Sequence, residues 1–408
     1  MVTGAEHIAP SAATRGAPPG APAHPDIGVL ALLLDPWGPR WMSRHHVLTR
    51  LARHFHVVWL NPALEWRAAL RAGRLRARES LVPGQPASFV VRDASPWSPV
   101  LYRPAWARAA TLRARLAAGR ASLVRRGCTR IVLYLWHPAF AEALDAVPHD
   151  FSVYHIYDEY SHAEREQPLD PAEERLIRTA GVVITLSPTM QARKGALSRH
   201  SVQIPNGVDF EAAATPVPEP SDLAAVPRPR IGYAGFIKKQ LDWELLDALA
   251  SRHPDWSFVF VGARSAQPEL PALLGRIAAR PNVHFLGAKS SAELARYPQH
   301  FDVSVMPYRL NDYTKYISPL KLYEYLAAGQ PVVSVPLPGL GDAASLVAVA
   351  EGTTAWERAI ADALSPDAHA ASQRAARQQE ARRHDWALVA ERIADRIVRG
   401  LDHVPTTP

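Results

Sequence analysis

The chain has little of several features that define other classes of protein. Its 408 residues include one cysteine, Cys128, which excludes an internal disulfide framework and a cysteine-built zinc site. A single cysteine fits a reducing compartment, and we expect this thiol to be buried and inert. No apolar run approaches the roughly 20 residues that a membrane-spanning helix needs. The first apolar run, residues 27–34, has only the length of a strand.

The first 25 residues lack apolar side chains that could form a core. They are mostly alanine, proline, glycine and small polar residues, so we expect residues 1–25 to be a disordered tail. They also lack the basic end and apolar centre of a secretory signal. The lack of such a signal and the lack of a membrane-spanning run together predict a cytoplasmic protein.

Two stretches of the first half lack acidic residues. Arg103 to Arg130 holds eight arginines, Arg67 to Arg78 holds five, and the whole chain has a net charge of +7. Tryptophans lie in or beside both stretches. A basic, aromatic face can lie on an anionic membrane surface, so the inner face of the cell membrane is one interpretation. Solvated helix faces and nucleic-acid binding are the alternatives, and no nucleic-acid motif stands out. The tryptophans are Trp66, Trp97 and Trp106.

What the chain does have is a regular alternation of strand-sized apolar runs and amphipathic helical segments, in two series. Such an alternation predicts βαβ units and parallel sheets. The first series has strands at 27–35, 56–61, 87–92, 131–136, 151–157, 182–186 and 201–205, with helices at 43–54, 105–126 and 171–179. The second has strands at 230–235, 257–262, 283–286, 303–306 and 331–335, with helices near 241–252, 269–279, 291–298, 318–328 and 354–364.

A proline-rich segment, residues 211–229, separates the two series and is interpreted as a linker. The chain is also longer than one typical domain. We therefore expect an α/β fold of two doubly wound Rossmann-like domains, 26–210 and 230–382, whose ligand edges face a cleft. Residues 366–402 are helical in pattern, and the last part, 383–402, is expected to cross back to the first domain. Its apolar stripe comprises Trp386, Val389, Ile393 and Ile397.

The stretch from Ser318 onward predicts an anion site. It reads as a helix between two strands, with the Ser318 hydroxyl as a helix cap and Pro319 in the first turn. The free N–H groups and dipole of such a helix end attract anions, and Lys321 adds a positive charge. Glu324 lies three residues later on the same face, and Gly329 ends the helix. The arrangement suits a nucleoside diphosphate with a ribose diol. The alternative is an ordinary capped helix that binds no ligand.

Other candidates follow the carboxyl ends of predicted strands, where open parallel sheets bind ligands. His137 and Asp158 follow strands of the first series. Gly235, Gly262 and Gly287 follow strands of the second. If the two edges face each other, these residues share one cleft.

The stretch 318–333, Ser-Pro-Leu-Lys-Leu-Tyr-Glu-Tyr-Leu-Ala-Ala-Gly-Gln-Pro-Val-Val, resembles the nucleotide-sugar motif of GT-B glycosyltransferases. It is most similar to the bacterial branch of glycosyltransferase family 4, the group 1 enzymes of cell-surface polysaccharide synthesis. Further similar segments occur through most of the chain, at 43–46, 204–209, 231–236, 256–262 and 282–287.

The resemblance implies a reaction and assigns roles. It implies retaining transfer of a sugar from a nucleotide-diphosphate donor to a glycan or lipid-linked acceptor, with no required cofactor and no metal. It implies that Glu324 holds the donor ribose and that His137 reaches the donor sugar. The donor-binding residues expected around the diphosphate are Gly235, Lys238, Lys239, Gly262, Gly287, Ser318, Pro319, Leu320 and Lys321.

The sequence departs from the family pattern at two places. Many relatives carry two glutamates eight positions apart, and here the earlier position is Tyr316. The usual glycine-arginine pair and later lysine are replaced by Gly235-Phe-Ile-Lys-Lys239, so Lys238 or Lys239 would contact phosphate from a shifted position. Candidate sugar or acceptor contacts are Arg44, Asp312 and Tyr316.

Several alternatives stay open at this point. Inverting chemistry would need a base, for which Asp158 and His137 are the candidates. An epimerase or hydrolase on the same two-domain frame is a second enzyme class. A non-catalytic nucleotide-sugar-binding partner of a glycan synthesis complex is the alternative from another class, and Tyr316 in place of a glutamate motivates it.

Overall fold

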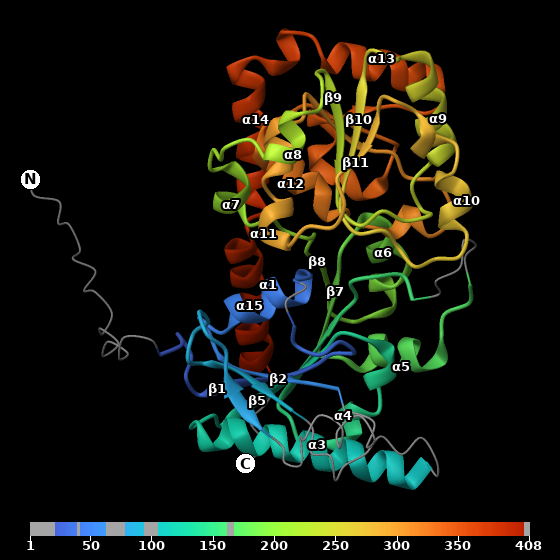
Figure 1. Cartoon of the computed structure of the whole chain (residues 1–408). Coiled ribbons are helices and arrows are strands. Elements are labelled where there is room, and N and C mark those ends of the chain that lie inside the picture. The colour runs from blue at the N-terminus through green and yellow to red at the C-terminus, as the bar shows by residue number, and fades with distance from the viewer. Residues whose placement is uncertain (1–20, 39–40, 63–77, 94–104, 161–166, 404–408) are drawn as a thin grey trace, which may run out of the picture.

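The computed structural model describes residues 21–38, 41–62, 78–93, 105–160 and 167–403. They form two lobes, each built on its own sheet, with one long helix running from the second lobe along the first (Figure 1). The α/β class and the two doubly wound sheets predicted from the alternation are confirmed.

The first lobe holds an eight-stranded sheet in the order β3-β4-β2-β1-β5-β6-β7-β8. All neighbours pair in parallel except β3 with β4, which is antiparallel. The strand order reverses direction beside β1, which is where such sheets open a ligand site. The strands are β1 Ile27–Leu32, β2 His56–Leu60, β3 Glu79–Leu81, β4 Phe89–Arg92, β5 Arg130–Leu135, β6 Phe151–His155, β7 Val182–Thr185 and β8 Ser201–Gln203.

Apolar side chains cover both faces of this sheet, as its nearly all-buried strands require. On one face, helix α1 (Ser43–Leu51) and helix α15 (Trp386–His403) share a single hydrophobic cluster with the strands. On the other face, α3 (Ala105–Arg125) and α5 (Pro171–Thr179) form a second cluster, which includes the buried Cys128. Burial raises the pKa of the Cys128 thiol to about 11, as expected of an inert thiol.

The second lobe holds a six-stranded parallel sheet in the order β11-β10-β9-β12-β13-β14. Its strands are β9 Arg230–Ala234, β10 Ser257–Val261, β11 Val283–Phe285, β12 Val303–Met306, β13 Val332–Ser334 and β14 Ala348–Val349. Its helices are α9 Trp243–Arg252, α10 Leu270–Leu274, α11 Ser291–Leu294, α12 Leu320–Ala328, α13 Thr353–Ala363 and α14 Ala371–Arg383.

Short helices occupy the connections. The α-helical ones are α4 Ala143–Ala146, α6 Pro188–Arg193, α7 Phe210–Ala214 and α8 Ser221–Ala224. The 3-10 helices are η1 Pro138–Phe140, η2 Gly195–Leu197, η3 Ile277–Ala279, η4 Tyr297–His300, η5 Thr314–Tyr316, η6 Pro338–Leu346 and η7 Asp367–His369. The segment interpreted as a plain linker therefore contains α8 and most of α7.

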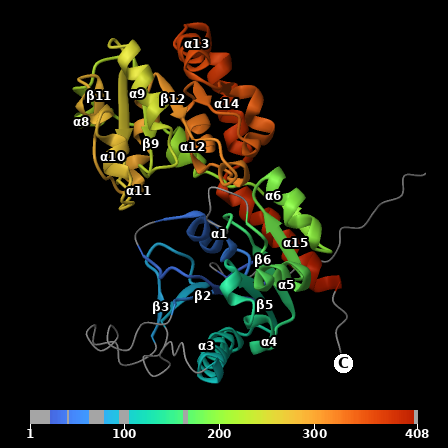
Figure 2. The ribbon, with the colours of Figure 1, turned by 90° about the vertical axis from the view of Figure 1, so that its right-hand side faces the viewer.

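The predicted helical tail is broken in two at Asp385. The Asp385 carboxylate accepts hydrogen bonds from the backbone N–H of Ala387, at 2.7 Å, and of Phe210, at 3.1 Å. The first bond starts α15 as a helix cap does, and the second ties the break to the first residue of α7. From there the apolar stripe of α15 packs into the first lobe, so the predicted crossing is confirmed (Figure 2).

Part of the basic face lies outside the described residues, namely residues 63–77 and 94–104 with Trp66, Trp97 and Arg103, as do residues 1–20 of the expected tail. Within α3, Trp106 is 74% exposed. Arginines of α3 also fasten neighbouring loops, since Arg115 donates to the carbonyl of Asn61 at 2.7 Å. Among the described residues, no helix combines the length and apolar character needed to cross a bilayer.

Candidate active site

The carboxyl edge of the second sheet is kept free of side chains at Gly235 and Gly262. Their φ angles are 144° and 141°, which other residues rarely adopt. A Cβ on Gly262 would lie 2.1 Å from the carbonyl oxygen of Gly235. A Cβ on Gly235 would lie 2.2 Å from Nζ of Lys321. Glycine is therefore needed for Lys321 to reach this edge. Gly287, which follows the next strand, accepts a hydrogen bond from Gly262 N–H at 2.9 Å.

The amino end of α12 faces the same edge, but Ser318 does not cap it. The residue before the helix is Pro319, which offers no side-chain cap, and the helix begins at Leu320. The Ser318 hydroxyl instead accepts a hydrogen bond from Asn206 N–H at 3.4 Å. The Asn206 side-chain amide donates to the Ser318 carbonyl at 2.8 Å. The expected cap is therefore wrong, and the first-turn N–H groups of α12 have no side-chain acceptor from Ser318.

Two residues of the first lobe hold the segment that leads into α12. Besides Asn206, Ser187 donates from its hydroxyl to the Tyr316 carbonyl at 2.8 Å. The Tyr316 ring is only 3% exposed and lies 5.3 Å from the Arg193 guanidinium. The side chain that replaces the family's glutamate is thus part of the contact between lobes. The position of Asn206 just before the proline-rich segment was the available sequence signal for a bridging role.

Two ammonium groups meet at this edge. The Lys321 ammonium lies 5.2 Å from the centre of the Tyr233 ring, and the Lys238 ammonium lies 5.9 Å from that of Tyr308. The pKa of Lys238 is lowered to about 8, mainly by burial and also by the positive charge of Lys321, while the Asp158 carboxylate opposes the shift. An anion placed between the two lysines would be attracted by both.

Glu324 completes the second-lobe side of the site. It is partly buried, and this burial raises the pKa of its carboxyl, while the nearby charge of Lys321 acts in the opposite direction. The two side chains are therefore close enough to interact, as their spacing on one helix face predicts. The site presents a cation near the helix tip and a hydrogen-bond acceptor one turn further.

Asp158 brings the first lobe to the same place. The Asp158 carboxylate accepts a hydrogen bond from Glu159 N–H at 2.8 Å. Burial raises the pKa of the Tyr313 hydroxyl, and the charge of Asp158 and a hydrogen bond to it raise it further, so this pair joins the two lobes. His137 starts η1 by accepting from Ala139 N–H at 3.1 Å. Asp158 thus lies in the interlobe site, while His137 caps a short helix at the edge of the first sheet.

Three other predicted residues have partners within the chain. The buried Arg44 forms an ion pair with Asp35. Lys239 lies 3.6 Å from Glu269, so Lys238 is the lysine that accompanies Lys321. Asp312 pairs with Lys315 at 3.1 Å.

A buried charge cluster lies directly behind Asp158, and the sequence did not reveal it. The Lys194 ammonium lies 2.9 Å from a carboxylate oxygen of Glu159 and 2.9 Å from one of Glu173. All three side chains are at most 4% exposed. The Tyr154 hydroxyl also donates to Glu173 at 3.0 Å. These contacts fix the loop that carries Asp158, and their residues are far apart in the sequence.

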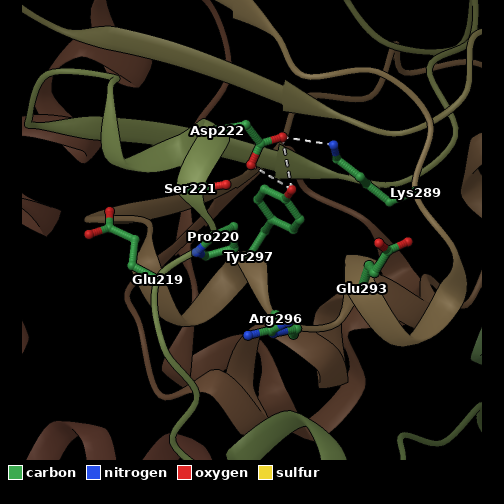
Figure 3. A pocket seen from close by; sticks show the side chains of 8 residues that line it. All are labelled: Glu219, Pro220, Ser221, Asp222, Lys289, Glu293, Arg296 and Tyr297. Carbon is green, nitrogen blue, oxygen red and sulfur yellow. Dashed lines mark hydrogen bonds and ion pairs between the residues drawn. The ribbon is translucent and has the colours of Figure 1, made fainter.

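A cavity of about 480 Å³ lies elsewhere, between the start of α8 and η4 (Figure 3). Two of its charged groups pair with each other: Asp222 lies 2.7 Å from Lys289 and also accepts from the Tyr297 hydroxyl at 2.8 Å. None of the predicted site residues lines it. Within the described ranges, no cluster of three or more His, Cys, Asp or Glu side chains is placed to hold a metal ion.

Known proteins share both the sequence pattern and the fold. Residues 228–366 match the family model described as glycosyl transferases group 1. The putative teichuronic acid biosynthesis glycosyltransferase TuaH of Bacillus subtilis is 31% identical over 180 residues. That match covers 43% of this chain and 45% of the relative, so it spans less than half of either protein.

Solved structures extend the likeness to nearly the whole chain. A sucrose-phosphate synthase from Thermosynechococcus elongatus superposes with a TM-score of 0.68 at 18% identity, covering 92% of this chain and 99% of that one. The E. coli trehalose-6-phosphate structure with bound UDP-2-fluoro glucose gives 0.66 at 13% identity, covering 93% and 99%. At these identities the likeness concerns the fold alone, and it is the GT-B fold.

The two sheets and the crossing helix thus define a GT-B fold. Within it, residues 228–366 match the model of the group 1 glycosyltransferases, and this matched segment includes the 318–333 stretch that carries the sequence resemblance.

Proposed function

We propose that this protein transfers a sugar from a nucleotide-diphosphate donor to a glycan or lipid-linked acceptor in cell-surface polysaccharide synthesis. The observation that carries the proposal is the meeting of Lys321, Lys238 and Glu324 at the amino end of α12, beside Gly235. The name of the Bacillus relative, which refers to teichuronic acid biosynthesis, supports a polysaccharide product.

In this proposal the second lobe holds the donor. The diphosphate lies at the first turn of α12, where backbone N–H groups and the helix dipole favour negative charge. Lys321 and Lys238 add two positive charges, and the Glu324 carboxylate accepts hydrogen bonds from the ribose hydroxyls. The glycine edge at Gly235, Gly262 and Gly287 lets the donor approach the backbone. No metal ion is required in this arrangement, because the two lysines and the helix end supply the positive charge.

The first lobe receives the acceptor, with His137 and Asp158 at the reacting end. We propose transfer with retention, in line with the family resemblance. The bond between the anomeric carbon and the donor phosphate breaks, a bond from that carbon to the acceptor oxygen forms, and the acceptor proton passes to the leaving phosphate. The charge that develops on the phosphate is stabilised by the donors already fixed at α12. Tyr313 and Asp158 hold the lobes together across the site.

The basic face of the first lobe is proposed to bring the protein to the anionic inner surface of the cell membrane. The exposed Trp106 and the arginines of α3 are the described residues that support it. Such a position suits an acceptor carried on a lipid.

Binding of a nucleoside diphosphate is expected to depend on pH through Lys238. Its pKa is lowered to about 8, and the bound diphosphate favours the charged form, so affinity is highest below this pH and falls as the pH rises through it. Calorimetric titrations at a series of pH values measure this. Lys238→Arg keeps its charge throughout and is expected to remove the fall. The proposal for Lys238 fails if both proteins show the same pH profile.

Glu324→Ala is expected to weaken nucleoside diphosphate binding roughly 10-fold to 100-fold, because hydrogen bonds to a charged acceptor are worth about 1.5–3 kcal/mol. Inorganic diphosphate, which has no ribose, is expected to bind the variant and the wild type equally. Calorimetry with both ligands separates the two effects. The exposed Glu293 is the matched control, and Glu293→Ala is expected to change neither affinity. An equal loss for both ligands would contradict the ribose role.

A further inference from the structure

A hollow of about 580 Å³ lies on the first lobe, at the opposite end of its sheet from the donor site. Its floor is the start of β6 and β7, around Phe151 and Val182, so it opens at the amino ends of the strands. The C-terminal turns of α15 form one wall, and this part of the helix runs beside β6 (Figure 2). The proposed function uses none of these residues.

The wall formed by α15 is strongly basic. Arg399, Gly400 and His403 lie three, four and seven residues after Arg396, so the four residues share one helix face. The opposite wall adds the imidazoles of His149 and His200. Two guanidinium groups and three imidazoles therefore surround a single space.

Gly400 shapes this hollow. Glycine is unfavourable inside a helix, yet here a Cβ would lie 2.2 Å from the Phe151 ring. A Cβ on Gly181, across the ring, would lie 2.5 Å from it. The two glycines thus leave room for the Phe151 ring, which lines the hollow between α15 and the start of β7.

The nearby acidic groups are already engaged. The Asp150 carboxylate accepts a hydrogen bond from Ile131 N–H at 2.6 Å, and Asp402 pairs with Arg130 at 3.3 Å. Among the described residues, Arg396 and Arg399 have no ion-pair partner. The imidazoles of His149 and His403 each use Nδ1 on a backbone carbonyl, which leaves Nε2 as the remaining polar atom of each ring.

We propose that this hollow is a second anion site, which binds the phosphate group of a phosphomonoester or phosphodiester. Two guanidinium groups on one helix face match phosphate oxygens with paired hydrogen bonds. Imidazole nitrogens on both walls complete the ring of partners. A soluble phosphorylated sugar and the headgroup of an anionic phospholipid share this chemistry. The vesicle experiment below distinguishes these two sources of the phosphate group.

The test measures inorganic phosphate binding by calorimetry in the Lys238→Ala/Lys321→Ala protein, in which the donor site no longer contributes. Phosphate is expected to bind this protein. Adding Arg396→Gln and Arg399→Gln is expected to weaken binding at least about tenfold, the effect of about 1.4 kcal/mol. Adding His403→Gln alone is expected to give a smaller loss. Arg392 lies on the same helix outside the hollow, so adding Arg392→Gln is the matched control and is expected to change nothing.

A second arm distinguishes the sources of phosphate. The same proteins are sedimented with vesicles of phosphatidylglycerol or of phosphatidylcholine. Binding to phosphatidylglycerol that falls with the two hollow arginines, and not with Arg392→Gln, identifies a lipid headgroup. Binding of free phosphate without a difference on vesicles identifies a soluble ligand. The proposal is overturned if neither probe binds, or if Arg392→Gln causes as large a loss as the hollow variants. Because the donor-site lysines are absent throughout, this result is independent of the transferase proposal.

Discussion

Lys321→Ala is expected to lower the turnover number of sugar transfer by roughly 100-fold to 1,000-fold. The reason is that one preorganised charge beside the leaving phosphate is typically worth about 2.7–4 kcal/mol in the transition state. The Lys321 ammonium is held over the Tyr233 ring in the space that Gly235 leaves, so no mobile group replaces it. Steady-state kinetics with the donor identified by screening measures the loss.

Lys321→Ala is also expected to change the pH dependence of diphosphate binding. Lys321 is one of the groups that lower the pKa of Lys238, so its removal is expected to raise that pKa and move the pH dependence of diphosphate binding upward. Lys289→Ala, in the same lobe but paired with Asp222 far from the predicted site residues, is the control and is expected to keep full activity. Unchanged turnover in Lys321→Ala would remove this lysine from the site.

Lys194→Met is expected to destabilise the protein by about 3–5 kcal/mol, the usual cost of leaving buried charges without their partner. Glu159 and Glu173 would then face each other with Lys194 absent. The pKa of Glu173 is already raised by burial, and Lys194 is the main group that opposes this rise. Its loss raises the pKa further above the unfolded value, so the variant is relatively more stable at low pH and loses stability as the pH rises. Urea unfolding at acidic and alkaline pH measures both effects.

An exposed ion pair provides the control for this prediction. Arg175 and Asp145 are about half and two-thirds exposed, so Arg175→Met is expected to change stability by at most about 1 kcal/mol. Adding Glu173→Gln to Lys194→Met is expected to recover part of the loss, because it removes the carboxylate that has lost its cation, whereas Glu159 keeps Arg193 at 3.5 Å. An unaltered unfolding curve for Lys194→Met would show that the cluster does not hold the Asp158 loop.

Much of the fold could be predicted because both sheets are parallel and buried. Their strands are short apolar runs between amphipathic helices, and such runs have clear local patterns. The end of α12 could also be predicted, because a glycine commonly ends a helix. In the structure Gly329 has a φ of 80° and closes the helix. The antiparallel strand β3 was missed because its three residues are only partly buried and carry no alternation.

The site was predicted only where its chemistry is local in the sequence. Lys321 and Glu324 share one helix, and their spacing of three residues was enough to predict that both side chains lie on the same face. The roles of Asn206, Ser187 and Lys194 depend on partners more than 20 residues away in the sequence. Whether Ser318 would cap α12 depended on a competing partner in the other lobe, and no local pattern shows such a competition.

The most direct test of the central claim is a donor screen by mass spectrometry. The full protein is incubated with a panel of nucleotide-diphosphate sugars and candidate glycan or lipid-linked acceptors, with Lys321→Ala as the inactive reference. The proposal predicts a new glycoside whose mass equals acceptor plus one sugar, formed with release of the nucleoside diphosphate. Free sugar or an epimer without acceptor would indicate a hydrolase or epimerase, and donor binding without any product would indicate a non-catalytic binding protein. Either outcome would contradict a transferase.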